Sequence, residues 1–188
     1  MCPYSDETAV YNPGRRFASI LTPPSRRGGR HPAPLLTTMK ISELLTPALV
    51  KLNLVSRTKD ELFEEMVQVF VDAGEIHDRE EAIEVLTRRE EQMSTGVGNG
   101  IGIPHGKLPE ATRSLIALGI SPEGIDYDAL DGQPVHIVTT IFAQVNNPGQ
   151  HIEILAEVAR LFAIPGFVGR MTAAKSPREV IELIKSEE

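Results

Sequence analysis

The chain has 188 residues, of which 41% are hydrophobic and 24% charged, which is the size and composition of one globular domain. Its net charge of −7 argues against nonspecific nucleic-acid binding, because that binding depends on cationic side chains. No apolar run approaches the roughly 18 residues that would span a bilayer, so we expect no direct membrane insertion. The one cysteine, Cys2, leaves no partner for an internal disulfide and favours a reducing, cytoplasmic setting.

The first 38 residues differ in composition from the rest of the chain. They hold five Arg against Asp6 and Glu7, a charge of +3 that leaves −10 for residues 39–188, and they contain six of the 14 prolines. This composition, with no sustained apolar periodicity, predicts a disordered arm, and the arm lacks the apolar stretch of a secretory signal. The alternative is that translation begins at Met39, where the globular pattern starts, so that the arm is an artefact of the chosen start.

Regular structure is predicted from Met39 onward. Leu49–Val55 alternates apolar and polar residues, which predicts a short strand. Thr58 and Glu61 form a capping box for a helix that Gly74 ends. Asp78 is predicted to cap a second helix, with Glu81 three residues on, and this helix extends to about residue 92.

The second half of the chain alternates between strands and helices. Ser114–Ile120 and Val135–Ala143 are apolar on both faces, as expected of central strands covered on two sides. An amphipathic helix is predicted over 151–163, and Ser176 with Glu179 caps a last helix. This interleaving predicts an α/β sandwich with helices on both faces of the sheet.

The glycine-rich segment over residues 94–107, STGVGNGIGIPHGK, is too interrupted by Gly and Pro for a stable helix. It is not a Walker A loop, because Ile101 stands where that motif needs Gly and Leu108 where it needs Ser or Thr. The spacing of its glycines does not match GxGxxG either. We therefore expect no nucleotide cofactor.

The segment presents one imidazole, His105, between Pro104 and Gly106. Proline stiffens the approach, and the missing side chain of Gly106 is expected to leave room beside the ring. A neutral imidazole is nucleophilic near pH 7 and can form a covalent phosphoryl intermediate. The alternative is that His105 only fills a turn.

Two further residues fit phosphoryl chemistry. His151 is predicted to open a helix, whose N-terminus favours an uncharged imidazole and attracts anions. Arg89, near the end of the second helix, could hold phosphoryl oxygens with its planar guanidinium. The alternative for Arg89 is a solvated charge paired with Glu90 or another acid.

Competing chemistries are weaker. His136 shares a strand face with apolar residues, which favours a hydrogen-bonded core histidine over a catalytic one. A zinc site from His105, His136 and His151 is conceivable, but the HExxH pattern is absent. The GxSxG motif is absent too, and Cys2 in a flexible arm is a poor nucleophile.

The segment TGVGNGIGIPHGK, with Arg89 and Glu90 upstream, resembles the enzyme IIA family of the fructose and mannitol type in the phosphoenolpyruvate-dependent sugar phosphotransferase system. It is especially similar to the nitrogen-regulatory branch. The resemblance runs from about Ile41 to the C-terminal helix. It implies a single domain over residues 39–188, with the fold of a three-layer α-β-α sandwich around a mixed β-sheet.

The resemblance also implies the roles of individual residues. His105 would accept a phosphoryl group on Nε2, giving a tele-phosphohistidine, while backbone holds its other ring nitrogen. Arg89 and His151 would stabilise the phosphoryl group, with no metal or cofactor. Gly102 stands where alanine is common in the family, a change that leaves the chemistry undisturbed.

Two functions remain open under this resemblance. In both, the donor is the phosphohistidine of the carrier HPr or of its nitrogen-branch counterpart. In the first, His105 passes the group to a sugar-specific IIB domain; in the second, phosphorylation is a regulatory signal that changes which target proteins the surface binds. Chain organisation favours the second slightly. We also expect an apolar rim, partly from Ile101 and Ile103, to dock the partner.

Overall fold

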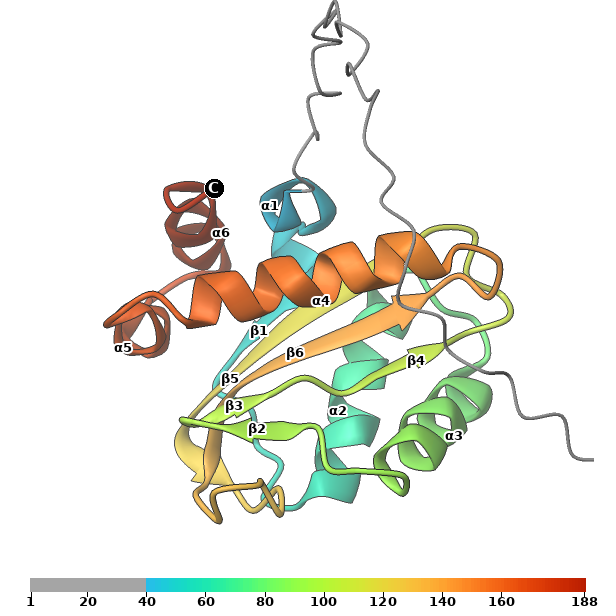
Figure 1. Cartoon of the computed structure of the whole chain (residues 1–188), viewed down its shortest axis with the longest axis horizontal. Helices are drawn as coiled ribbons and strands as arrows, with labels where there is room; N and C mark the ends of the chain where they lie inside the picture. Colours follow the sequence, from blue (N-terminus) through green and yellow to red (C-terminus); the bar gives the residue numbers. More distant parts are fainter. Residues whose placement is uncertain (1–39) are drawn as a thin grey trace, which may run out of the picture. The chain divides into compact units, whose positions relative to one another are not determined.

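The computed structural model describes residues 40–188; the predicted arm and the proposed start at Met39 lie outside the described residues. Within that range the chain forms six α-helices, one 3-10 turn and a six-stranded sheet (Figure 1). None of these helices is long and apolar enough to cross a membrane. The elements in chain order are α1 Ile41–Leu44, η1 Pro47–Leu49, β1 Val50–Leu52, α2 Lys59–Asp72, α3 Arg79–Glu90, β2 Gly96–Gly98, β3 Ile101–Gly102, β4 His105–Lys107, β5 Leu115–Ile125, β6 Val135–Ala143, α4 Pro148–Phe162, α5 Phe167–Ala173 and α6 Pro177–Lys185.

The sheet is mixed and runs in the order β1-β5-β6-β3-β2, with β4 also pairing with β6. β5 and β6 are antiparallel and form the centre, which confirms the two predicted central strands. β3 and β4 lie one after the other along β6, both parallel to it, with His105 opposite Ile141. The glycine-rich segment therefore supplies short strands rather than one loop, and β6 fixes the position of His105.

Helices cover both faces of the sheet (Figure 1). α2 and α3 pack on one face, against β5 and β4, and α4, α5 and α6 pack on the other, against β6, β5 and β1. Aliphatic and aromatic side chains from both layers fill the two interfaces with the sheet. The predicted three-layer α-β-α sandwich is confirmed.

The predicted helix caps are present. Thr58 and Glu61 form the complete capping box at the start of α2, and the Ser176 side chain accepts from Glu179 N at the start of α6. Ala73 is the C-cap of α2, and the next residue, Gly74, is left-handed with φ of 73°. There the amides of Gly74 and Glu75 donate to the carbonyls of Val71 and Phe70, which satisfies two groups at the helix end.

Some predicted boundaries were wrong. β1 spans only Val50–Leu52, because Asn53 has a φ of 56° that interrupts the extended backbone. α4 begins at Pro148 rather than at residue 151, since Asn147 caps it by accepting from Gln150 N. α5 was not predicted: its N-cap is Gly166, which makes no side-chain cap bond.

Candidate active site

The strand β4 presents His105 and places its neighbours on opposite faces. Because side chains alternate along a strand, His105 and Lys107 share one face and Gly106 lies on the other. A Cβ at position 106 would overlap Val85 Cγ1 of α3. The missing side chain thus lets α3 approach the strand, and the expectation that Gly106 leaves room beside the imidazole was wrong.

Both ring nitrogens of His105 have partners. Nδ1 lies 2.8 Å from the carbonyl oxygen of Ile103, and Nε2 lies 3.2 Å from Nε of Arg89. A carbonyl can only accept and the Arg89 Nε–H can only donate, so the proton is on Nδ1 and the lone pair is on Nε2. The neutral tautomer with a nucleophilic Nε2 is therefore the one that these contacts select.

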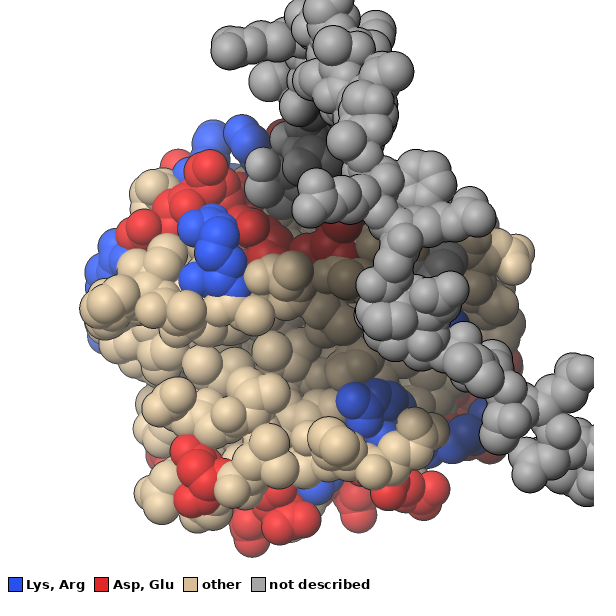
Figure 2. Space-filling view, in the orientation of Figure 1, with Lys and Arg blue, Asp and Glu red and all other residues tan. Residues whose placement is uncertain are grey.

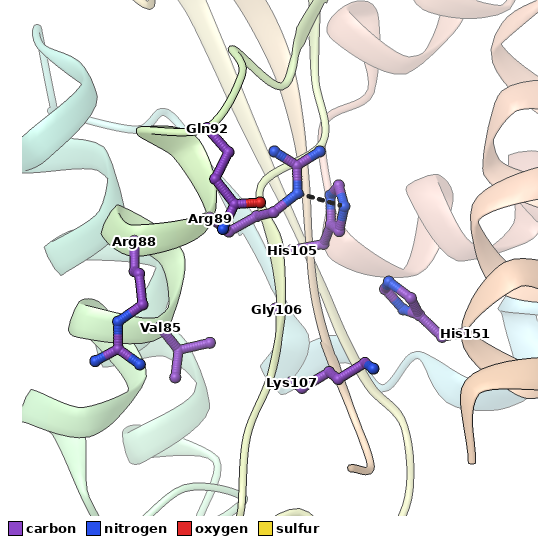
Figure 3. A pocket seen from close by; sticks show the side chains of 8 residues that line it. All are labelled: Val85, Arg88, Arg89, Gln92, His105, Gly106, Lys107 and His151. Atoms are coloured by element: carbon purple, nitrogen blue, oxygen red, sulfur yellow. Dashed lines mark hydrogen bonds between the residues drawn. The ribbon is translucent and has the colours of Figure 1, made fainter. Parts of the chain in front are cut away.

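Arg89 does not pair with its neighbour Glu90. Its Nη1 donates to the carbonyl of Met93 at 3.0 Å while Nε donates to His105. The Glu90 carboxylate is buried and has other partners. Figure 3 shows that α3 lies on one side of β4 and that the Arg89 side chain extends past this strand. Its guanidinium thereby contacts the His105 imidazole.

His151 faces His105 from the other helical layer (Figure 3). It is the fourth residue of α4, and the centroids of the two rings are 5.3 Å apart with 45° between their planes. Its Nδ1 is buried and has no hydrogen-bond partner among residues 40–188. All three predicted site residues are therefore brought together, but the His151 ring lacks the double anchor of His105.

Burial and nearby cations lower the pKa of both imidazoles. For His105 the largest cause is desolvation, and the charge of Arg89 adds to it, although the Ile103 carbonyl acts in the opposite direction. For His151 the causes are desolvation, then the charges of His105, Lys107 and Arg89. Both shifts favour the neutral form of the ring, which is the state that a nucleophilic imidazole needs.

The two rings and Arg89 lie in an open pocket of about 430 Å³. It also contains residues that the sequence analysis did not single out, namely Val85, Arg88, Gln92 and Lys107. Three cationic side chains and no carboxylate line the pocket, although residues 39–188 are acidic overall. On the face shown in Figure 2, acidic and basic atoms lie together at the upper left, acidic atoms lie along the lower margin, and uncharged atoms cover most of the middle. The pocket is thus suited to an anion.

Two other expectations concern residues that the pocket does not include. His136 Nδ1 lies 3.0 Å from the Ser121 carbonyl, which makes it a hydrogen-bonded structural histidine, as predicted. Ile101 and Ile103 are only 5% and 8% exposed, so the predicted apolar rim from these residues was wrong. Both side chains pack into the core instead. Residues 40–188 contain no cluster of three or more His, Cys, Asp or Glu side chains that could hold a metal ion.

Comparison with known proteins identifies the family of the chain. The model of the family described as "Phosphoenolpyruvate-dependent sugar phosphotransferase system, EIIA 2" matches residues 43–187. The chain belongs to this family, which confirms the resemblance inferred from the glycine-rich segment. It is 40% identical over 146 residues to the fructose-specific EIIABC component of Bacillus subtilis. That match covers 78% of this chain but only 23% of the Bacillus protein.

Solved structures show the same fold. The nitrogen regulatory protein IIA-Ntr of Neisseria meningitidis matches with a TM-score of 0.72 and 28% identity, over 77% of this chain and 98% of that one. A chain of the Escherichia coli complex between enzyme IIA and phosphorylated enzyme IIB of the mannitol system matches with a TM-score of 0.64 and 22% identity. This second match covers 76% of the chain and 97% of that one, and supports the fold alone.

Proposed function

We propose that the protein is a phosphocarrier that accepts a phosphoryl group on Nε2 of His105. The observation that carries this proposal is the contact between His105 Nδ1 and the Ile103 carbonyl, which leaves the Nε2 lone pair directed to the cationic pocket. The donor is a phosphohistidine of an HPr-like carrier protein. Nε2 attacks phosphorus as the donor N–P bond breaks, and the electron pair of that bond stays on the donor ring.

Arg89 and His151 stabilise the charge on the transferred group. Arg89 donates to Nε2 in the unphosphorylated state, so its guanidinium must shift from the nitrogen to the phosphoryl oxygens as the N–P bond forms. His151, 5.3 Å away between ring centroids, is the second group placed to donate to these oxygens. No bond to phosphorus is assigned to either residue.

The fate of the phosphoryl group on His105 separates the transport function from the regulatory function. We favour transfer from His105 to a IIB partner, because the chain is 40% identical to a fructose-specific EIIABC component. A regulatory role, in which phosphorylation changes the affinity for target proteins, is the second candidate, and the likeness to IIA-Ntr of Neisseria supports it.

The site is tested by phosphorylation of His105→Ala with purified phosphorylated carrier. We expect the variant to incorporate no acid-labile phosphate and to keep the wild-type circular dichroism spectrum. His77→Ala is the matched control, because His77 is exposed on a different surface, beside Glu110. Full incorporation in His105→Ala, or a phosphopeptide that lacks His105, would refute the assignment.

The branch is tested by comparing donors and acceptors. Wild-type protein is phosphorylated with HPr or with a nitrogen-branch carrier, and the loaded protein is then mixed with a fructose-type IIB domain. Rapid loss of phosphate from His105 to IIB supports transport. Stable phosphate in the presence of IIB, with fast loading by the nitrogen-branch carrier alone, supports regulation.

A further inference from the structure

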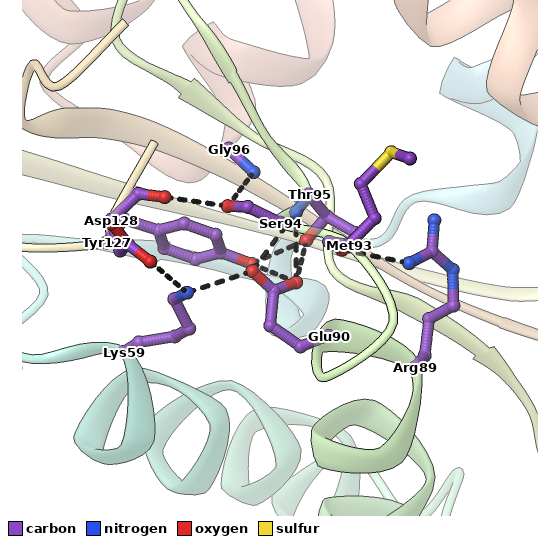
Figure 4. A network of polar contacts seen from close by, with 9 residues as sticks. All are labelled: Lys59, Arg89, Glu90, Met93, Ser94, Thr95, Gly96, Tyr127 and Asp128. Carbon is purple, nitrogen blue, oxygen red and sulfur yellow. Dashed lines mark hydrogen bonds and ion pairs between the residues drawn. The ribbon is translucent and has the colours of Figure 1, made fainter. Parts of the chain in front are cut away.

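A buried polar network lies behind the active site and centres on Glu90, the last residue of α3 (Figure 4). Its carboxylate accepts from the Thr95 amide at 3.0 Å and from the Thr95 hydroxyl at 2.5 Å. Lys59 Nζ of α2 lies 3.1 Å from the same carboxylate. Tyr127 closes the network through its hydroxyl, 2.7 Å from that of Thr95, and burial raises its pKa far above the ordinary value.

The network is connected to His105 through two residues, Thr95 and Ile103. The Thr95 amide is held by Glu90, and the Thr95 carbonyl accepts from Ile103 N at 2.9 Å. The Ile103 carbonyl in turn accepts from His105 Nδ1. An unbroken chain of hydrogen bonds therefore leads from the Glu90 carboxylate to the ring nitrogen that sets the tautomer of His105.

The network also fixes the short segment that holds Arg89. Residues 91–95 leave α3 directly after Glu90 and return to the Glu90 carboxylate at Thr95, so both ends of the segment are attached to one residue. Within that segment the Met93 carbonyl accepts from Arg89 Nη1. The same carboxylate thus constrains the contacts of both Arg89 and His105.

Filling the space at position 90 would not by itself require a carboxylate. A buried carboxylate has to be compensated by a cation and by hydrogen-bond donors, and Lys59 and Thr95 supply them here. Its two oxygens together receive the amide, the hydroxyl and the ammonium group, which an apolar side chain or an amide could not do. The geometry of the 91–95 turn follows from this pattern of donors.

We propose that Glu90 is a positioning residue for phosphoryl transfer: by fixing Thr95 it orients the Ile103 carbonyl on His105 and the Met93 carbonyl on Arg89. Glu90 touches neither the phosphoryl group nor the ring. This inference rests on the proposed phosphocarrier function, and it adds to that function a residue outside the pocket.

The test compares Glu90→Gln with Glu91→Gln. Both variants remove one negative charge from adjacent residues, but Glu91 is exposed. We expect Glu90→Gln to slow transfer from phosphorylated carrier by about tenfold or more, because a small misplacement of reacting groups is enough for such a loss. Glu91→Gln should keep the wild-type rate.

A second readout separates positioning from stability. Nitrogen-15 NMR of unphosphorylated protein reports which nitrogen of His105 carries the proton. Wild type and Glu91→Gln should show the Nδ1–H form, whereas Glu90→Gln should show a mixture of tautomers while remaining folded. A wild-type rate together with a pure Nδ1–H form in Glu90→Gln would overturn the proposal.

If Glu90→Gln does not fold, Thr95→Val takes its place. This variant keeps the Thr95 amide and its carbonyl and removes only the hydroxyl bonds to Glu90 and Tyr127. It should shift the tautomer of His105 in the same direction, and a wild-type spectrum and rate would count against the proposal. A protein that is never phosphorylated on His105 would refute the proposed phosphocarrier function. The NMR measurement needs no phosphate, so it would still decide whether Glu90 sets the tautomer of His105.

Discussion

His105 and His151 face each other across one pocket, yet the protein holds them in different ways. His105 lies on a strand, with a backbone carbonyl on Nδ1 and the Arg89 guanidinium on Nε2. His151 lies on a helix, and its buried Nδ1 has no partner among residues 40–188. The first ring has a defined tautomer and direction, as a nucleophile requires, whereas the second is free to take either tautomer and to respond to what enters the pocket.

The difference follows from the elements that carry the two rings. A strand next to β6 has its backbone bonded along its length, and the short β3–β4 connection turns the Ile103 carbonyl back to the ring. In α4, by contrast, no backbone carbonyl bonds the buried Nδ1 of His151. The His105 ring is therefore anchored by its own segment of backbone, and the His151 ring is not.

Among the groups around the two rings, the largest effect on the transfer rate is expected from removing Arg89, the partner of His105 Nε2. Arg89→Ala should slow phosphorylation of His105 by about a hundredfold, because it deletes the donor best placed to offset the developing charge. Stopped-flow or quench measurements with phosphorylated carrier give the rate. Arg88→Ala is the matched control, since Arg88 lines the same pocket but pairs with Glu84. Equal rates in the two variants would remove the role assigned to Arg89.

A smaller effect on the transfer rate is expected from removing the His151 ring, which has fewer hydrogen-bond partners than the His105 ring. His151→Ala should slow the transfer by about tenfold without preventing phosphorylation, which corresponds to the loss of one hydrogen bond to a charged group. The same assay applies, with His77→Ala as the control. A loss as large as that in Arg89→Ala would contradict the smaller role assigned to His151.

The smallest effect concerns the dependence of stability on pH. Because the folded protein lowers the pKa of His105 and of His151, the unfolded chain binds more protons below the ordinary value of 6.5. The free energy of unfolding should thus fall as the pH drops from about 6.5 through the lower folded values. Urea unfolding across this range measures the loss.

Two controls show whether the two histidines cause this loss of stability: a variant that lacks both rings, and the more acid pH range in which Glu65 contributes. The double variant His105→Asn with His151→Asn should lose most of the decline just below pH 6.5. The pKa of Glu65 is also lowered, by bonds from Ser56 and Lys51 that outweigh its burial, but its ordinary value is 4.5 and its contribution is lost at more acid pH. An unchanged decline in the double variant would place its origin in other groups.

Much of the fold could be predicted because its boundaries are set by local chemistry. The caps at Thr58, Asp78 and Ser176 depend on side chains within three residues of the helix start, and their bonds are present. The central strand β6 has the predicted bounds, since a strand buried on both faces is continuously apolar. α5 could not be predicted in this way, because it begins after a left-handed Gly166 with no side-chain cap.

The site was predictable only in part. His105 stood out from its flanking residues, but its pairing with Arg89 depends on α3 meeting β4, a tertiary contact that spacing along the chain does not encode. Resemblance to a family supplied that pair. Lys107 could have been found from strand alternation with His105, and Arg88 and Gln92 from helical spacing with Val85 and Arg89. The burial of Ile101 and Ile103 was missed because their strand neighbours were unknown.

The close approach of α3 to β4 constrains how this protein can change over time. The volume next to Gly106 is already filled by a methyl group of Val85. A larger residue at 106 is therefore tolerable only in a background where residue 85 has already become smaller, and a lone substitution at 106 would push Arg89 away with its helix. The two positions are expected to vary as a coupled pair in the evolution of this chain.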